Sequence, residues 1–347
     1  MDRAVRRILC DPNLVKARDT HLLRLESVFS GEALDRPFVL QSINGESRLD
    51  PFADPEGWLD DALAYLAENA DGLDDKNVFR PLCLEFRPYG VHFVESMLGA
   101  RVYHHEGEWW VEHLPKPIGD LRPPILQEDR TWHLARNMVR AFLLRKVSLP
   151  FFSIPTISGC LNVALSIYGE GFLVAMAVDP DAARHDLKMI NDVLCSLCEW
   201  YSKALPPHQL QPTCASSRCQ PPGRGQIYGC STHLISPHMY RDLVAPLDQE
   251  LLSVYPNGGM IHLCGDHTRH IPLWKRMDSL RAFQINDRAA DDLEAYFGAT
   301  RDDQVIYFTP TATTDVGRAL DVSQGKRIVI TPLPPSRAER AVISGQP

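Results

Sequence analysis

The fold is decided by residues 258–285, which read GGMIHLCGDHTRHIPLWKRMDSLRAFQI. A short apolar run is followed by a helix-like segment and then by a second apolar run. The same alternation continues to apolar runs at 305–308 and 327–331. Strands that alternate with helical segments are typical of consecutive β-α units, so this half of the chain predicts a parallel sheet.

His262 and Cys264 end the first of these runs and are followed by Gly265. Side chains alternate along a strand, so these two residues point to the same face, and the glycine suits a turn after the strand. Imidazole nitrogen and thiolate sulfur are both good zinc ligands. We therefore expect His262 and Cys264 to be metal ligands and catalytic residues. The alternative is a core cysteine beside an incidental histidine.

The remaining sequence extends the series to about eight strands, which favours a single (β/α)8 barrel of the TIM type over an open sheet. The expected strands are 37–40, 81–86, 150–154, 225–230, 260–264, 281–285, 305–308 and 327–331. The main expected helices are 21–29, 58–69, 131–146, 181–204, 236–252, 267–277, 289–297 and 315–320. We expect a helical or loose lead-in at 1–20, the barrel at 21–335, and a tail at 336–347. A hairpin at 100–111 and a Pro-rich surface loop at 206–224 complete the prediction.

Composition narrows the class of protein. The chain has 347 residues and a net charge of -8. It contains no basic run, which argues against nucleic acid or anionic membrane as a partner. No apolar stretch approaches the length of a membrane span, and the N-terminus lacks the apolar region of a signal peptide. Nine scattered cysteines suit reduced thiols in the cytoplasm, where we expect the protein.

A third metal ligand is expected from another strand end. Cys230 is the first choice because it ends the preceding strand in the stretch IYGCSTH, and His233 is the second. The alternative for Cys230 is a small buried hydrophobic side chain. Glu85 ends the second strand and is a candidate ligand, substrate contact or ordinary surface carboxylate. Asp266 either orients His262 or, as we favour, caps a helix.

Substrate contacts are expected at the mouth of the barrel, where the carboxyl ends of parallel strands meet. Glu85, Tyr89, Tyr228 and Asn286 all lie at or just after expected strand ends. We therefore predict that these four side chains contact a small-molecule substrate.

The other cysteines have simpler interpretations. Cys195 and Cys198 are three positions apart on an expected helix among apolar residues, which favours core packing. Cys214 and Cys219 lie in the Pro-rich loop. They are candidates for binding a metal with Cys230 or for a labile disulfide, although a solvated loop is the default.

Five segments resemble the uroporphyrinogen decarboxylase-like superfamily, and in particular its zinc methyltransferases. They are RLESVFSGEALDRPFVL (24–40), SMLGARVYHHEGEW (96–109), GEGFLVAMAVDPDAARHDLKMI (169–190), HLISPHMYRDLVAPLDQEL (233–251) and GGMIHLCGDHTRHIPLWKRM (258–277). The resemblance implies a barrel that uses zinc to activate a thiol such as coenzyme M. It also implies a corrinoid on a partner protein as the methyl donor, and a monomer or homodimer.

The sequence departs from this family in two places. The methyltransferases have a further ligand cysteine near the C-terminus, whereas no cysteine follows Cys264 here. The decarboxylases have an Arg-rich loop after the first strand, whereas Arg48 is the only cation in residues 41–48. A methyl or alkyl transferase is the preferred hypothesis. The alternatives are a metal-free decarboxylase or lyase that binds a carboxylated molecule through Arg48 or Arg87, and a non-catalytic ligand-binding barrel.

Overall fold

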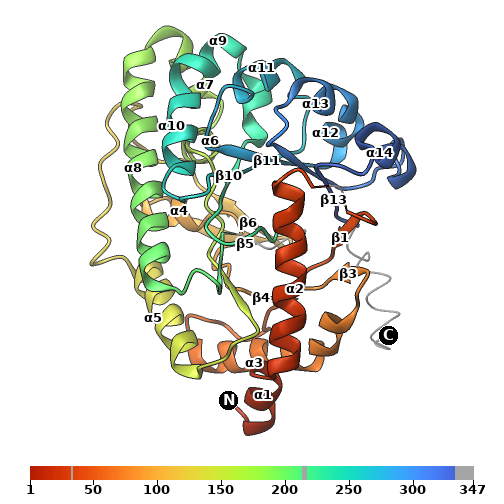
Figure 1. The fold of residues 1–347 in the computed structure, drawn as a ribbon. Helices are drawn as coiled ribbons and strands as arrows, with labels where there is room; N and C mark the ends of the chain where they lie inside the picture. Colours follow the sequence, from red (N-terminus) through yellow and green to blue (C-terminus); the bar gives the residue numbers. More distant parts are fainter. Residues whose placement is uncertain (33, 213–216, 333–347) are drawn as a thin grey trace.

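The computed structural model describes residues 1–32, 34–212 and 217–332, and it is a mixed α/β structure with helices around parallel strands (Figure 1). The strands are β1 (Phe38–Leu40), β2 (Ile43–Gly45), β3 (Val78–Phe79), β4 (Leu82–Glu85), β5 (Val102–His105), β6 (Glu108–Val111), β7 (Phe151–Ser153), β8 (Leu210–Gln211), β9 (Gly225–Tyr228), β10 (Gly259–Leu263), β11 (Leu280–Ile285), β12 (Val305–Phe308) and β13 (Ile328–Ile330). Apart from the predicted β5–β6 hairpin, all paired strands are parallel. The predicted parallel α/β class is confirmed.

The parallel strands form two sheets that follow one another around the molecule. One sheet has the order β3-β1-β13-β12-β11-β10-β9, and the other has the order β2-β4-β7-β8. The chain passes directly from β1 into β2 and from β3 into β4. Backbone bonds from Gln41 to Phe79 and from Ile43 to Pro81, both 2.9 Å, continue the pairing across this step. At the other side of β1, this first strand pairs in parallel with the last strand, β13, as in a barrel.

Closure of that barrel is not seen in the described residues, because no strand pairing joins β8 to β9. A side chain replaces the backbone ladder at this place. The amide of Gln211 accepts from the Gln220 backbone N–H at 2.9 Å and donates to its carbonyl at 2.8 Å. These two bonds satisfy backbone groups that a closing strand would otherwise pair.

The prediction of a surface loop at 206–224 is wrong for much of the segment. Arg218, Cys219 and Gln220 are buried. The bonds to Gln211 hold the chain inward, where composition alone indicated a solvated loop. Cys214 lies outside the described residues, as does the predicted tail at 336–347.

Helices pack around the strands, with α5 and α8 at the left of Figure 1 and α12 to α14 at the right. The helices are α1 (Arg3–Leu9), α2 (Pro12–Phe29), α3 (Pro55–Glu68), α4 (Phe93–Met97), α5 (Arg130–Arg145), α6 (Cys160–Tyr168), α7 (Gly171–Val178), α8 (Pro180–Ala204), α9 (Pro237–Met239), α10 (Ala245–Leu252), α11 (Ile271–Trp274), α12 (Asp287–Asp291), α13 (Leu293–Ala299) and α14 (Val316–Ser323). Shorter turns are η1 (Ala70–Asp74), η2 (Cys230–Leu234), η3 (Tyr240–Val244) and η4 (Thr268–His270). The lead-in is helical, and α2 runs continuously past residue 20.

The helix expected at 236–252 is interrupted. Ser236 caps its start by accepting from the Met239 N–H, as its position before a proline predicted. The central segment η3 is a π-helix, and α10 begins at Ala245 just before Pro246. Proline lacks an N–H and its ring crowds the carbonyl four residues earlier, which disfavours a continuous α-helical ladder here.

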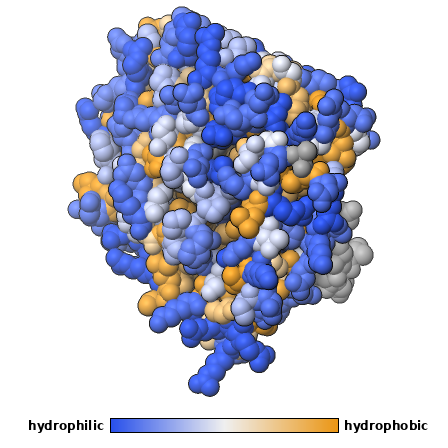
Figure 2. All heavy atoms as spheres, viewed as in Figure 1, coloured by the Kyte–Doolittle hydropathy of each residue, from blue (hydrophilic) through white to orange (hydrophobic). Residues whose placement is uncertain are grey.

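Figure 2 shows hydrophilic side chains over most of one face, with apolar side chains in small separate patches. Among the residues that the structure describes, no individual helix has both the length and the apolar character to cross a membrane, and only the bent pair α6 and α7 reaches that length and composition together.

A buried carboxyl group joins α10 to its neighbours. Asp248 is 3 % exposed and accepts a hydrogen bond of 2.8 Å from the hydroxyl of Tyr240. The same hydroxyl accepts from Trp274 Nε1 at 2.8 Å. Burial raises the pKa of Asp248 to about 7, although the bond from Tyr240 lowers it. The carboxyl therefore carries its proton in the folded state over a pH range in which the unfolded chain has lost it.

This raised pKa predicts a pH-dependent stability. Between about pH 4 and 7 the unfolded chain ionises while folded Asp248 stays protonated, so the free energy of unfolding falls as the pH rises and levels above 7. The neutral Asp248→Asn variant lacks this slope. From pH 5 to pH 8 its stability relative to wild type should improve by roughly 2–3 kcal/mol in urea unfolding. If the free energies of unfolding of variant and wild type differed by the same amount at pH 5 and pH 8, the raised pKa of Asp248 would be contradicted.

Candidate metal centre

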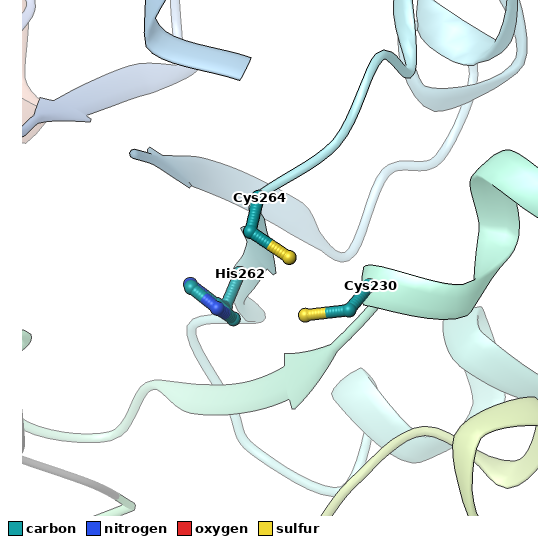
Figure 3. A group of neighbouring side chains, drawn as sticks. All are labelled: Cys230, His262 and Cys264. Atoms are coloured by element: carbon teal, nitrogen blue, oxygen red, sulfur yellow. The ribbon is translucent and has the colours of Figure 1, made fainter. Parts of the chain in front are cut away.

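Three side chains from two adjacent strand ends converge in the structure (Figure 3). His262 lies within β10, Cys264 follows that strand, and Cys230 opens η2 just after β9. Their ligand atoms all lie within 4.8 Å of one another. We call these three residues the Cys-His-Cys cluster. The expected pair on β10 is thus brought together with the cysteine expected to be the third ligand.

The parallel register around β10 fixes the histidine of the cluster. His262 is in register with Tyr228 on β9 and with Gln284 on β11, so the three side chains share one face. His262 Nδ1 is hydrogen-bonded to Gln284 Oε1, and the Tyr228 ring packs edge-on with centroids 5.1 Å apart. Because Oε1 can only accept, Nδ1 carries the proton, and Nε2 keeps a lone pair for a metal.

Burial and neighbouring groups shift the pKa values of all three side chains of the cluster. Burial and the positive charge of Arg218 lower the pKa of His262, so its ring is neutral. The hydrogen bond with Cys230 and the interaction with His262 lower the pKa of the Cys264 thiol. The same bond to Cys264, together with burial, raises the pKa of Cys230. Of the two sulfurs, Cys264 is therefore the one that more readily becomes the thiolate, the form in which cysteine binds a metal.

His267 ties together the two turns that carry the cysteines. Its ring is fully buried, and Nε2 accepts from the Gly265 N–H at 3.2 Å. Nδ1 therefore donates to Thr232 Oγ1 at 3.0 Å, and that hydroxyl donates to the Gly229 carbonyl at 2.8 Å. Gly229 precedes Cys230 and Gly265 follows Cys264, so this chain of bonds spans the cluster. Burial lowers the pKa of His267 to about 3, which keeps it neutral.

His233 and Asp266, the other residues considered as a ligand or as a partner of His262, lie outside the Cys-His-Cys cluster. His233 Nδ1 is bonded to the Cys230 carbonyl at 2.5 Å, and its side chain is outside the cluster. Asp266 accepts from the N–H and hydroxyl of Thr268 at 3.2 and 2.9 Å. Asp266 thus forms a local turn, whereas the N-cap of η4 is His267, so the favoured helix cap at Asp266 is not found. Gln284 is the residue that orients His262.

Glu85 and Tyr89 line a cavity of about 690 Å³ beside the mouth, together with Arg87 and Trp109. Glu85 is buried at the end of β4 and lies 3.2 Å from Arg87, which also binds Glu46 at 2.6 Å. None of the three residues of the Cys-His-Cys cluster is among the residues that line this cavity.

Asn286 follows β11, and its backbone N–H donates to the Leu263 carbonyl at 3.3 Å. Its side-chain Oδ1 is buried and has no hydrogen-bond partner among the described residues. The residue therefore lies next to the strand end that carries the cluster, with an acceptor available to a ligand.

The CxxC pair lies on α8, where Cys198 is almost fully buried. Burial raises the pKa of both Cys195 and Cys198 to about 12. Cys198 belongs to the hydrophobic core and Cys195 packs against it, so the expected role in core packing is confirmed.

Sequence reasoning missed Gln284, His267 and Arg218 as residues around the cluster. Gln284 had a usable signal, because it occupies the same position on its strand as His262 does on the preceding one. The roles of His267 and Arg218 depend on loop geometry, which a single sequence does not contain.

Comparison with known proteins shows that this fold resembles that of a solved structure. No protein-family model matches the chain, and no curated protein sequence matches it. A solved structure of a methyltransferase from Methanosarcina mazei is similar, with a TM-score of 0.60 and 13 % sequence identity. The alignment covers 90 % of this chain and 92 % of that one. At this identity the likeness establishes the shared fold over nearly the whole chain.

The bonds around His267 predict its importance for metal binding. His267→Ala should weaken zinc binding about 10- to 100-fold, because the turns bearing Cys230 and Cys264 are no longer tied. Chelator competition measures this, with the exposed His238→Ala as the control that keeps wild-type affinity. Thr232→Val should act in the same direction, and the double variant should be little worse than either single one. Unchanged zinc affinity in His267→Ala would contradict the role.

Proposed function

We propose that this protein is a methyl (or alkyl) transferase that acts on a thiol activated by zinc in the Cys-His-Cys cluster. The observation that carries the proposal is the convergence of Cys230, His262 and Cys264 at the ends of β9 and β10. The carboxyl ends of parallel strands are where this architecture carries its catalytic groups. The likeness in fold to a methyltransferase supports the class of reaction. The order of the strands likewise supports a TIM-type (β/α)8 barrel as the complete architecture.

The donor set fits zinc. Two sulfurs and one imidazole nitrogen are ligands that this ion accepts, and three protein ligands leave a fourth position for substrate. The family that the sequence resembles takes its third ligand from a C-terminal cysteine. In this chain Cys230 supplies a sulfur from the neighbouring strand end instead, so the missing cysteine does not leave the site incomplete.

Each part of the site has a defined task in this proposal. Bound zinc would act as a Lewis acid that lowers the pKa of the substrate thiol. Gln284 holds His262 in the tautomer that presents Nε2, and His267 fixes the spacing of the two cysteine-bearing turns. In the reaction a new S–C bond forms, and the bond from the methyl group to its donor breaks. The donor keeps the electron pair, and the thiol proton passes to solvent.

The methyl donor we propose is a corrinoid carried by a partner protein, as the family resemblance implies. The competing lyase hypothesis needs a basic pocket formed by Arg48 or Arg87. Arg48 is exposed, and Arg87 is paired with Glu46 and Glu85. No observation at these two arginines therefore favours carboxylate binding by them.

Metal content tests the site. Protein purified under reducing conditions should contain about one zinc per chain. Cys230→Ser, His262→Gln and Cys264→Ser should each lose most of it, because two remaining ligands bind zinc weakly. Cys10→Ser is the matched control, since its thiol lies far from the cluster against the Lys146 carbonyl. Wild-type protein without zinc, or Cys230→Ser with full zinc, would overturn the proposed site.

Metal removal tests the reaction. With methylcobalamin as a soluble donor and a small thiol as acceptor, thioether formation should stop after chelation and return when zinc is restored. Mass spectrometry of the thioether gives the readout. Full turnover in the chelated protein would contradict the proposal and favour a metal-free mechanism.

A further inference from the structure

A cavity of about 450 Å³ lies between α2, η1 and the residues that lead into β1 and β3. Six residues of α2 line it, including Lys16, His21 and Arg24. They form two rows with a spacing of four positions, which places them on one face of the helix. The helix packs against η1 and β1 (Figure 1). Cavities of this size hold small organic molecules.

The cavity is at the opposite end of the sheet from the Cys-His-Cys cluster. Arg36 and Lys76 line it, and each precedes its strand, β1 or β3, by two positions. These strands pair in parallel, so their amino ends lie side by side. Every pairing in this sheet is parallel, and the cluster lies at the carboxyl ends of β9 and β10. A molecule bound in the cavity is therefore no part of the metal centre.

Positive charge is concentrated in this cavity. Its lining includes Lys16, Arg24, Arg36 and Lys76, and Asp74 is the one carboxylate among the described lining residues. The chain as a whole has a net charge of -8, so this concentration is local. The guanidinium groups of Arg24 and Arg36 both donate to the Lys76 carbonyl, at 3.2 and 2.7 Å. Two like charges held this close repel each other, and a bound anion would offset that repulsion.

The neighbouring carboxylates do not neutralise these cations. Asp19 pairs with Arg18 at 2.8 Å, and Asp75 pairs with Arg80. Asp35 acts electrostatically on one of the lining arginines without an ion pair. Within the described part of the chain, none of the four lining cations has a carboxylate within ion-pair distance. The cavity therefore keeps an unbalanced positive charge.

His21 adds a polar atom without a partner. Its side chain is 6 % exposed, and Nδ1 is buried with no hydrogen-bond partner among the residues that the structure describes. The ring stacks on Phe79 with centroids 5.0 Å apart and planes 11° apart, which limits its rotation. Burial, and after it the charge of Arg24, lowers the pKa of His21, so the ring is neutral at neutral pH. Buried polar atoms rarely lack a partner in folded proteins, and a bound ion or ligand supplies one.

We propose that this cavity is a second ligand site and that its ligand is a small molecule with a phosphate ester or a short polyphosphate group. Guanidinium groups bind phosphate oxygens in a bidentate manner, and lysine ammonium groups add charge without a fixed geometry. Four cations match a group that carries two or more negative charges. Leu73 and Ala17 also line the cavity and give an apolar surface for the rest of the molecule. The proposal is independent of the metal centre and of the transferase reaction.

Calorimetric titration of pyrophosphate into the full-length protein tests the site. One pyrophosphate should bind per chain, both to the protein as purified and after metal removal. Arg24→Met/Arg36→Met should bind it at least tenfold more weakly, because both guanidiniums are lost. Lys16→Met/Lys76→Met should bind it at least threefold more weakly. These lysines are exposed, so the second variant provides the test if loss of Arg24, which packs over Phe38 at 5.7 Å, prevents folding.

The matched control is Arg140→Met/Arg276→Met, which removes the same charge elsewhere. Both arginines are exposed, and neither has an ion pair among the described residues. This variant should bind pyrophosphate as wild type does. A general effect of net charge would instead weaken binding equally in the two double arginine variants. Circular dichroism establishes that each variant is folded.

Malonate and adenosine diphosphate define the class of ligand. Malonate carries two carboxylates and should bind more weakly than pyrophosphate, because each carboxylate offers only two coplanar oxygens. Displacement of pyrophosphate by adenosine diphosphate supports a ligand with an organic group on its phosphate. Pyrophosphate binding without displacement supports a short polyphosphate.

Lysine acetylation followed by mass spectrometry tests where the anion binds. Pyrophosphate should protect Lys16 and Lys76 from acetylation, whereas the exposed Lys116, which is outside the cavity lining, should react as before. Equal reactivity of Lys16 and Lys76 with and without saturating pyrophosphate would place the anion elsewhere and overturn the site.

Three further results would overturn this inference. They are the absence of pyrophosphate binding to wild type, tighter binding of malonate than of pyrophosphate, and equal affinity of wild type and a folded Arg24→Met/Arg36→Met. If that variant does not fold, unchanged affinity in Lys16→Met/Lys76→Met has the same meaning. Zinc content and thioether formation bear only on the transferase proposal, so the two proposals fail separately.

Discussion

The hydrogen bond between His262 and Gln284 is the interaction on which the site depends. It exists because β9, β10 and β11 pair in parallel and place Tyr228, His262 and Gln284 side by side on one face. The carbonyl of Gln284 fixes the histidine tautomer, and the Tyr228 ring limits its rotation. Only with this orientation does a buried neutral imidazole present a lone pair next to two sulfurs. A slip of one residue in β10 would turn His262 to the opposite face of the sheet, and the same slip in β11 would turn Gln284 away from it.

The sulfurs of the site are positioned by turns, which are less constrained than strands. Cys230 follows Gly229 and Cys264 precedes Gly265, and His267 connects the two turns through Thr232. Neighbouring strand ends thus bring together three side chains that could hold a metal ion. All three ligands of the proposed metal centre come from β10 and from the residues just after β9 and β10. Arg218 lies near this cluster, because its Cζ atom is 4.8 Å from the centroid of the Tyr228 ring that packs against His262.

Much of the fold was predictable from the sequence because its signals are local. Apolar runs such as 259–263 and 305–308 and the Ser236-Pro237 cap have a fixed meaning wherever they occur. The pair of residues two apart on β10 was likewise sufficient to select His262 and Cys264. The burial of 217–220 was not predictable, because the side chain of Gln211 replaces a backbone ladder. The partners of His262 could not be predicted either, since they depend on the register between strands that are distant in sequence.

X-ray absorption at the zinc K-edge of the zinc-loaded protein tests the central claim most directly, because it counts the atoms bound to the metal. The account predicts two sulfurs at about 2.3 Å and one nitrogen at about 2.0–2.1 Å, with a light atom in the fourth position. Addition of 3-mercaptopropionate should replace that light atom with a third sulfur. A shell of nitrogen and oxygen alone, or a single sulfur in wild type, would contradict the Cys-His-Cys centre and the thiol chemistry built on it.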